Sequence, residues 1–307
     1  MSNAGMRIVP PDDEVTVISP DCLELDLCHH RIRKLEHLEP LRKIERLYLR
    51  RNLLKKIENL HTLTTLMELE LYDNQITKIE NLDSLTKLNI LDLSFNRLTK
   101  LENLEKLVNL QKLYFVANKI TVIENIGMLT NLTMLELGDN KLKKIENLGT
   151  LVGLRQLFLG KNKISKIENL DNLVNLEILS LQANRIVKIE NLDKLVKLTQ
   201  LYLSENGIEV MENLSTLTGL ETLDLSQNRI KMIADLKAME QLEELWMSSN
   251  NVYDWKNINV LKDNRKLRTI YLEGNPVAND IRYRAKLSDM LPQLRKIDAT
   301  YCRATIF

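Results

Sequence analysis

Twelve positions of this chain carry an unusual set of side chains at a nearly constant spacing. Successive positions recur with a period of about 22 residues, and only the last interval is slightly longer. The set is Asp26, Tyr48, Glu70, Asp92, Tyr114, Glu136, Phe158, Ser180, Tyr202, Asp224, Trp246 and Tyr271. Six are aromatic and five are acidic, yet none is Lys or Arg in a chain with 43 basic residues. Aromatic anchors beside charged groups are typical of protein recognition, so this acidic–aromatic stripe indicates a binding surface.

A purely structural interpretation of the stripe accounts for only part of it. Aromatic residues favour strands and stack across neighbouring strands. That preference does not explain the acids, which are poor strand formers, or the lack of basic residues. A negative row calls for a partner with Lys or Arg at the contact and argues against nucleic acid. We expect binding to be focused on Glu244, Trp246, Asp224 and Tyr271, because Glu244 lies two residues before Trp246 and shares its strand face.

Other residues that could do chemistry have no productive spacing. The histidines and cysteines are His29, His30, His37, His61, Cys22, Cys28 and Cys302. Their spacing matches no metal-ligand pattern, and an odd cysteine count without end clusters favours a reduced intracellular protein. The chain lacks the phosphate-binding, nucleophile-elbow and zinc-protease motifs. We therefore predict that the protein is not an enzyme and needs no cofactor or metal.

A repeat explains how the stripe is positioned. Asparagine recurs with the same period from Asn52 to Asn250, His30 lies one period earlier, and Asn275 follows after a slightly longer interval. Each unit reads LxxLxLxxNx(I/L)xxIENLxxL, which is the leucine-rich repeat pattern. The LxL part predicts a short strand, and the apolar residues three apart predict 3₁₀ or helical turns. We expect about twelve units in one solenoid, with a curved parallel sheet on the concave face and turns on the convex face.

The ends of the solenoid need caps, because a terminal unit would expose its leucines. We predict an N-terminal extension over residues 1–20, of which 1–4 resemble a cloning remnant, repeats over 21–275 and a C-terminal cap over 276–307. The cap should contain a helix from Asp280 to Met290, and no interdomain linker is visible.

No apolar run is long enough to span a membrane. A net charge of +1 gives no general attraction to nucleic acid or lipid. Lys and Glu of the convex segments are interpreted as solvated surface.

Several strings go beyond the generic repeat. Residues 71–76 (LYDNQI), 157–164 (LFLGKNKI), 206–210 (NGIEV) and 291–300 (LPQLRKIDAT) resemble the family of protein phosphatase 1 regulatory subunit 7. The resemblance covers roughly residues 20 to 301. It implies a non-enzymatic scaffold that binds the protein phosphatase 1 catalytic subunit through the concave face, also in a ternary complex with phosphatase inhibitor 3, in nucleus and cytoplasm.

The resemblance also implies which residues bind. The match holds at Asp92, Glu136, Phe158, Asp224, Glu244, Trp246 and Tyr271, while Tyr114 stands where the family often has Phe. With the remaining stripe positions, the predicted protein-binding residues are Asp92, Tyr114, Glu136, Phe158, Asp224, Glu244, Trp246, Tyr271, Tyr202, Glu70 and Tyr48. The acidic N-terminal extension of larger relatives is absent or trimmed, and the short Arg/Lys-Val-x-Phe docking motif does not occur. Binding should then depend on the folded surface of a protein that we expect to be monomeric when free.

An alternative function remains open. A leucine-rich repeat adaptor of a ribonucleoprotein or axonemal complex would use the same anchors for a different partner. The two functions differ in which protein co-purifies.

Overall fold

The computed structural model describes residues 6–8 and 16–302. The expected cloning remnant at residues 1–4 lies outside this range. The chain forms two compact units, one comprising Met1–Leu142 and Glu146–Leu154 and the other Lys143–Ile145 and Arg155–Phe307. The predicted domain boundaries stay a prediction.

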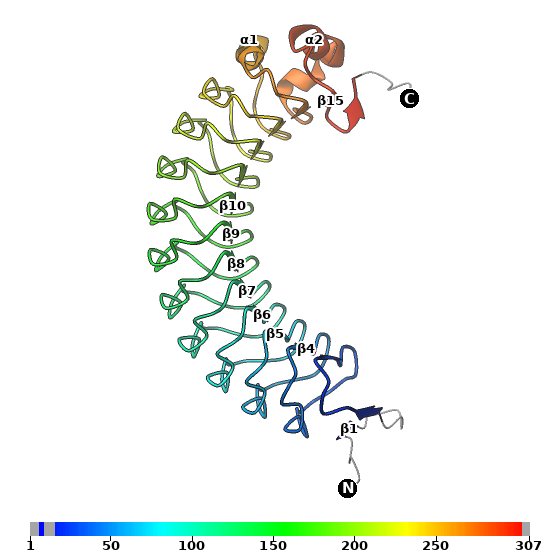
Figure 1. Cartoon of the computed structure of the whole chain (residues 1–307). Helices are drawn as coiled ribbons and strands as arrows, with labels where there is room; N and C mark the ends of the chain where they lie inside the picture. The colour runs from blue at the N-terminus through cyan, green and yellow to red at the C-terminus, as the bar shows by residue number, and fades with distance from the viewer. Residues whose placement is uncertain (1–5, 9–15, 303–307) are drawn as a thin grey trace. The chain divides into compact units, whose positions relative to one another are not determined.

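The first unit is built from six parallel strands, each three residues long. These are β3 (Glu24–Asp26), β4 (Arg46–Tyr48), β5 (Glu68–Glu70), β6 (Ile90–Asp92), β7 (Lys112–Tyr114) and β8 (Met134–Glu136). Each strand pairs with the next in parallel, so sequence order is also spatial order (Figure 1). An antiparallel pair, β1 (Met6–Ile8) and β2 (Thr16–Ile18), precedes them. The sequence analysis did not predict this pair.

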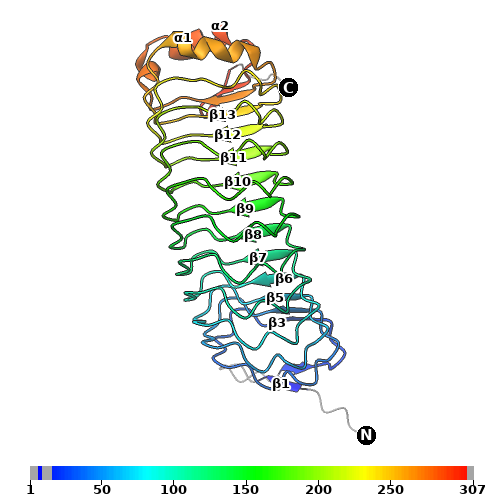
Figure 2. The same ribbon diagram turned by 90° about the vertical axis from the view of Figure 1, so that its left-hand side faces the viewer.

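The second unit continues the same arrangement. Its strands are β9 (Gln156–Phe158), β10 (Ile178–Ser180), β11 (Gln200–Tyr202), β12 (Thr222–Asp224), β13 (Glu244–Trp246), β14 (Thr269–Tyr271), β15 (Lys296–Ile297) and β16 (Thr300–Tyr301). All neighbouring strands pair in parallel except β15 with β16, which pair antiparallel. Figure 2 shows these strands one above another, with helices at the C-terminal end.

Four short helical segments lie at the C-terminal end of the second unit. They are α1 (Trp255–Ile258), the 3₁₀ helix η1 (Asn259–Asp263), the 3₁₀ helix η2 (Pro276–Asn279) and α2 (Tyr283–Met290). The predicted C-terminal helix is present, but it begins at Tyr283 rather than Asp280. The Asp280 carboxylate instead accepts the Arg282 backbone N–H at 2.8 Å and pairs with Lys286, in the turn before the helix.

The core is a stack of leucine and isoleucine side chains. Leu47, Leu69 and Leu91, at the centres of successive strands, have no exposed surface. Successive residues of a strand point to opposite faces, so the residues on either side of each central leucine face outward. One turn alone could not cover its leucines, whereas stacked turns bury them together.

The asparagine ladder satisfies backbone groups that the strands leave unpaired. In one turn, the Asn74 side-chain amide donates to the carbonyls of Leu49 (2.9 Å) and Leu71 (3.0 Å), and its oxygen accepts the Leu54 N–H (3.0 Å). Asn74 is only 7% exposed, and a buried backbone group without a partner would be costly. The ladder therefore joins each turn to its neighbour.

The opposite side of each turn consists of tight turns rather than helices. The Leu63 N–H donates to the Leu60 carbonyl, and the Leu66 N–H to the Leu63 carbonyl, at 3.0 and 3.1 Å. These bonds span three residues, as in a 3₁₀ helix. Asn59 adopts a left-handed conformation (φ 60°), which asparagine tolerates better than most residues, and its amide donates to the Leu35 carbonyl at 2.6 Å.

The predicted fold class is confirmed as a parallel-strand solenoid of about 11 turns of ~22 residues with a C-terminal helix. Over the described residues, no helix combines the length and apolar character needed to cross a membrane.

Candidate protein-binding surface

The structure brings the predicted binding residues into one row in each unit. In the first unit, Tyr48, Glu70, Asp92, Tyr114 and Glu136 are register partners on the consecutive strands β4 to β8. In the second unit, the row across β9 to β14 is Phe158, Ser180, Tyr202, Asp224, Trp246 and Tyr271. Glu244 lies beside this second row on β13. Each row is on the outward side of its sheet, opposite the buried leucines.

The acidic side chains of the first row are more buried than carboxylates on a solvated surface are. Glu70 is only 6% exposed, and its carboxylate forms an ion pair with Arg50, whose Nη2 donates to Oε1 at 2.6 Å. Burial raises the pKa of Glu70, while the hydrogen bond and charge of Arg50 oppose that rise. The ion pair thus keeps a charged carboxylate in a poorly hydrated place.

Asp92 and Glu136 are held by backbone N–H groups that follow their strands by two residues. Asp92 accepts the Ser94 N–H at 2.8 Å, and Glu136 accepts the Gly138 N–H at 2.9 Å. Burial raises the pKa of Asp92, and it raises the pKa of Glu136 to about 7. Glu136 therefore titrates near neutral pH, and its negative charge is only partly present there.

Tyr114 lies between Asp92 and Glu136. Its pKa is raised mainly by burial and, to a smaller extent, by the charges of these two carboxylates. The Tyr114 hydroxyl accordingly stays protonated, so this position of the row can donate a hydrogen bond.

Basic residues share the face of the first row, although none lies within it. Arg46 and Lys112 precede stripe positions by two residues, and Arg50 follows one by two. Arg46 Nε lies 3.0 Å from Glu24 Oε2. The period of two that places Glu244 beside Trp246 in the sequence also places these basic residues on the strand face, although the predicted stripe did not include them. The negative character predicted for the stripe is therefore partly offset in the first unit.

The same period of two, applied to the sequence after Glu70, indicates a second aromatic feature. Tyr72 lies two residues after Glu70, and its ring is 4.9 Å from the ring of Phe95, which is 44% exposed. This pair adds apolar area at the edge of the first unit's strand face.

The second row contains a packed aromatic cluster. The ring of Trp246 lies 6.1 Å from the ring of Tyr202 and 6.1 Å from that of Tyr271, with interplanar angles of 57° and 74°. Asp224 occupies β12, between the strands of Tyr202 and Trp246, and is only 7% exposed. Its carboxylate accepts the Ser226 N–H at 2.9 Å. Aromatic pairs at such distances and tilts are favourable.

Polar contacts fix the orientation of this cluster. The indole N–H of Trp246 donates to Glu244 Oε2 at 3.0 Å, and the Tyr202 hydroxyl donates to Gln200 Oε1 at 3.0 Å. Lys296 Nζ lies 5.2 Å from the centre of the Tyr271 ring. An anchor already held in place loses little conformational freedom when a partner binds. The predicted pairing of Glu244 with Trp246 is thus a direct hydrogen bond.

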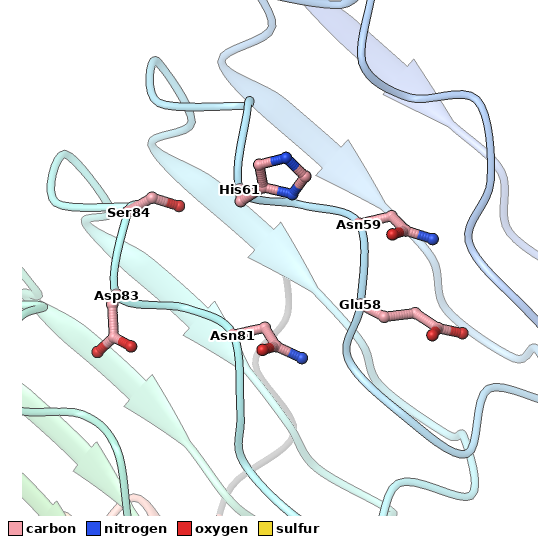
Figure 3. A pocket seen from close by; sticks show the side chains of 6 residues that line it. All are labelled: Glu58, Asn59, His61, Asn81, Asp83 and Ser84. Carbon is pink, nitrogen blue, oxygen red and sulfur yellow. The ribbon is translucent and has the colours of Figure 1, made fainter.

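Two surface hollows lie away from both rows. One of about 390 Å³ is lined by Glu58, Asn59, His61, Asn81, Asp83 and Ser84. Figure 3 shows these side chains on two successive turns. A second hollow, of about 370 Å³, is lined by Arg33, Leu53, Lys55 and Gln75. Across the described residues, no three His, Cys, Asp or Glu side chains are grouped so as to hold a metal ion.

Comparison with known proteins gives partial sequence matches to phosphatase regulators. The chain is 52% identical over 46 residues to protein phosphatase 1 regulatory subunit 7 of Mus musculus, a match covering 15% of this chain and 13% of that protein. It is 52% identical over 62 residues to the Xenopus tropicalis protein of the same name, covering 20% and 18%. The matches therefore span less than a fifth of either relative.

Solved structures show the same fold over most of the chain. An internalin (inlF) from Listeria monocytogenes superposes with a TM-score of 0.75 at 25% identity, covering 93% of this chain and 90% of that one. InlJ from the same organism superposes with a TM-score of 0.73 at 24% identity, covering 90% and 62%.

Family models agree with the repeat. Models described as leucine-rich repeat match residues 64–106, 111–204 and 199–304. These ranges extend over more than half of the sequence and include β5 to β16. The chain belongs to the leucine-rich repeat family.

Proposed function

We propose that this protein is a non-enzymatic regulatory or scaffold subunit that binds the protein phosphatase 1 catalytic subunit through its acidic–aromatic strand face. The observation that carries the proposal is the cluster of Trp246 with Tyr202, Tyr271 and Glu244 on the second unit. The local identity to regulatory subunits of this phosphatase supports the choice of partner.

The chemistry of the second row suits a protein partner. Its aromatic rings offer rigid apolar area with little rotamer freedom to lose. Glu244 and Asp224 supply negative charge beside the rings, which favours a partner surface with Lys or Arg. The first row adds Tyr48, Tyr114 and acids whose charge depends on pH. We infer that the second unit supplies the anchors and that the first extends the contact.

The remaining properties follow from the same proposal. The protein acts by holding the catalytic subunit rather than by catalysis of its own. Phosphatase inhibitor 3 is a candidate third partner, and the protein works in nucleus and cytoplasm. Free protein is proposed to be monomeric.

A pull-down with purified catalytic subunit tests the proposal. Phe158→Ala combined with Trp246→Ala should reduce binding strongly, because truncating a central anchor typically costs about 2 kcal/mol or more. The matched control is Tyr253→Ala, since Tyr253 is an aromatic residue of the second unit outside the row and 63% exposed. Undiminished binding by the double variant, with Tyr253→Ala equally active, would refute the strand-face model.

Identification of the natural partner separates the proposal from the alternative adaptor function. Affinity purification with mass spectrometry should recover the phosphatase catalytic subunit with the unmodified protein and lose it with the double variant. Recovery of a ribonucleoprotein or axonemal complex in its place would favour the alternative.

A further inference from the structure

An exposed apolar row crosses four successive turns of the second unit, away from the strand face. Its members are Val187, Val210, Met232 and Tyr253, which are between 55 and 64% exposed. Each lies in the segment after a ladder asparagine, one or two residues beyond a buried Ile or Val. A single exposed apolar residue is ordinary, whereas contiguous exposed apolar area is typical of an interaction site. We call these four residues the apolar strip.

Backbone hydrogen bonds hold the turns of the strip side by side. The Gly207 N–H donates to the Ile186 carbonyl and the Arg229 N–H to the Ile208 carbonyl, both at 2.8 Å, and the Asn251 N–H repeats this bond to the turn before it. These turns are therefore spaced like neighbouring strands, about 4.8 Å apart at the backbone. The strip residues follow these bonded groups by one or two residues, so they are neighbours from turn to turn.

The repeat does not require apolar residues at these positions. In the turns before the strip, the equivalent pairs of outward residues are polar, with Val122 as the one exception. They are Arg33 and Lys34, Lys55 and Lys56, Thr77 and Lys78, Thr99 and Lys100, Thr121 and Val122, Lys143 and Lys144, and Ser165 and Lys166. Four consecutive turns with an apolar member therefore depart from the pattern.

Other exposed valines of the second unit do follow the pattern. Val152, Val174 and Val196 occupy one repeat position, at which most other turns have Thr, as at Thr130 and Thr218. Val and Thr share a β-branched shape, so the position selects shape rather than apolar character. The apolar strip has no such explanation, because it places Val, Met and Tyr where other turns have Lys, Thr or Ser.

A glycine leaves part of the strip uncovered. The position of Gly207 carries a long polar side chain in most other turns, for example Gln75, Arg185 and Arg229. Gly207 does not have a positive φ, so its backbone conformation does not require glycine. A Cβ at Gly207 would lie 3.2 Å from Val187 Cγ1. The missing side chain thus bares the Val187 methyl group and permits close approach of another molecule.

We propose that the apolar strip is a docking site for an amphipathic helix of a partner protein, with acidic residues flanking its apolar face. A helix along the stack presents apolar side chains about every 5.4 Å, close to the turn spacing of about 4.8 Å. The four turns span about 15 Å, which matches about ten helical residues with an apolar side chain every three or four positions. Same-face side chains of an extended strand, about 6.6 Å apart, match less well.

The charges beside the strip favour acidic flanks on the helix. Lys188 and Lys231 are exposed within its segments, and among the described residues no salt bridge involves either of them. Most turns carry such lysines, but here they border apolar area, so acids of a docked helix would meet them. Glu209, whose Oε1 is 4.0 Å from Arg229 Nη1, opposes an anionic lipid surface. The site goes beyond the strand-face function and does not depend on it.

Fluorescence anisotropy on the full chain tests the inference. The probe is a labelled 18-residue helical peptide with leucine at every third or fourth position, flanked by glutamate. Val210→Ser, Met232→Ser and Tyr253→Ser together should weaken its binding about tenfold or more, because truncating contact anchors has effects of this size. No binding of the peptide to the unmodified protein would overturn the proposal.

The matched control removes the same number of exposed apolar side chains elsewhere in the second unit. Val152→Ser, Val174→Ser and Val196→Ser together should weaken binding by less than about twofold, since surface residues outside a contact contribute little. Equal weakening by both triple variants would refute a localised site. Circular dichroism establishes that both variants are folded.

A gain of side chain provides an independent test. Gly207→Gln should weaken peptide binding about threefold or more, because the new side chain covers Val187 in the space that close approach needs. The repeat accepts this residue, as Gln75 shows at the equivalent position. Unchanged binding would show that the helix does not approach this part of the strip.

Changes of probe separate the possible occupants. A peptide with lysine in place of glutamate should bind at least about fivefold more weakly at low salt, and equal or tighter binding would refute the acidic flanks. A dimer in light scattering, or binding to phosphatidylserine vesicles, that is lost in the strip variant would assign the strip to a second copy or to lipid and overturn the proposal. Pull-down of the phosphatase catalytic subunit should be unchanged by the strip variant, so the two proposals fail separately.

Discussion

At the residue scale, burial alters the charges that the stripe presents. Glu136 accepts the Gly138 N–H, yet burial still raises its pKa to about 7. Burial also raises the pKa of Glu70, where Arg50 opposes the rise. The two carboxylates thus meet the cost of burial with different partners, an ion pair at Glu70 and a backbone hydrogen bond at Glu136. The stripe is therefore not a uniformly negative line, because Glu136 is only partly charged at neutral pH.

Glu136→Gln should change how stability depends on pH. The pKa of Glu136 lies near 4.5 in the unfolded chain and about 7 in the folded protein. Below pH 4.5 the group is protonated in both states. Between pH 4.5 and 7 the unfolded chain releases the proton first, so the free energy of unfolding falls as pH rises. Stability then stays at its lower level above pH 7.

Urea unfolding at several pH values measures this effect. Relative to the unmodified protein, the Gln variant should gain on the order of 2 kcal/mol at pH 8 and nothing at pH 4. Gln keeps an oxygen that can accept the Gly138 N–H, so the comparison isolates the ionisation. Parallel pH profiles for the two proteins would contradict the assignment.

At the element scale, the Asp298 carboxylate takes over at the last strand a role that a strand carbonyl plays in earlier turns, where for example the Met247 N–H donates to the Tyr271 carbonyl. Its Oδ1 accepts the backbone N–H groups of Leu272 (2.9 Å) and Glu273 (3.0 Å) and the Tyr283 hydroxyl (3.2 Å). Asp298 itself is in a left-handed conformation, with φ of 51°. The Tyr283 ring lies 6.2 Å from that of Trp255, so the contact also joins α1 and α2 over the end of the solenoid.

Asp298→Ala should destabilise the C-terminal end by about 2 kcal/mol, because three donors, two of them part-buried, lose their acceptor. Alanine is also less suited than aspartate to the left-handed conformation. Asp298→Asn is the matched control, since it keeps the acceptor oxygen and tolerates this conformation, and it should retain most of the stability. Hydrogen exchange should accelerate in residues 267–298 of the Ala variant. Equal loss of stability in both variants would show that the negative charge, rather than the acceptor, is what matters.

At the scale of the whole molecule, each turn is stabilised mainly by the turns next to it. Each strand of the main sheet pairs only with its immediate neighbours within a unit. Stability in such an array is approximately a sum of turn and nearest-neighbour terms. The same linear arrangement displays long rows of outward residues, so one row can be rich in acids while the protein as a whole is nearly neutral.

Leu69→Ala should therefore have a strong but localised effect. Leu69 has no exposed surface, and truncating a buried leucine typically costs about 3 kcal/mol. Hydrogen exchange should accelerate in the turns of Leu47, Leu69 and Leu91, and much less around Leu135 in β8. Val108→Ala, at a site 39% exposed, is the control and should change stability by less than about 0.5 kcal/mol. Uniform loss of protection throughout the first unit would contradict the nearest-neighbour description.

The sequence by itself determined the repeat, the strand positions and the identity of the outward row. A regular period with LxL and asparagine encodes local structure, because each turn repeats the same backbone and the same buried positions. The predicted row from Tyr48 to Tyr271 accordingly lies on β4 to β14, within each unit as expected. The role of that row in binding stays a prediction, as do the partner and the cellular location.

The tertiary structure alone decided which of those residues contact one another and how deeply each is buried. The Arg50 pair with Glu70, the Trp246 cluster and the raised pKa of Glu136 depend on side chains from different turns and on how deeply they are buried. The N-terminal strand pair and the use of the Asp298 carboxylate in place of a strand carbonyl arise where the repeat stops and its pattern no longer applies. A sequence period fixes which face a residue occupies, whereas burial and pairing depend on the neighbours that stacking brings together.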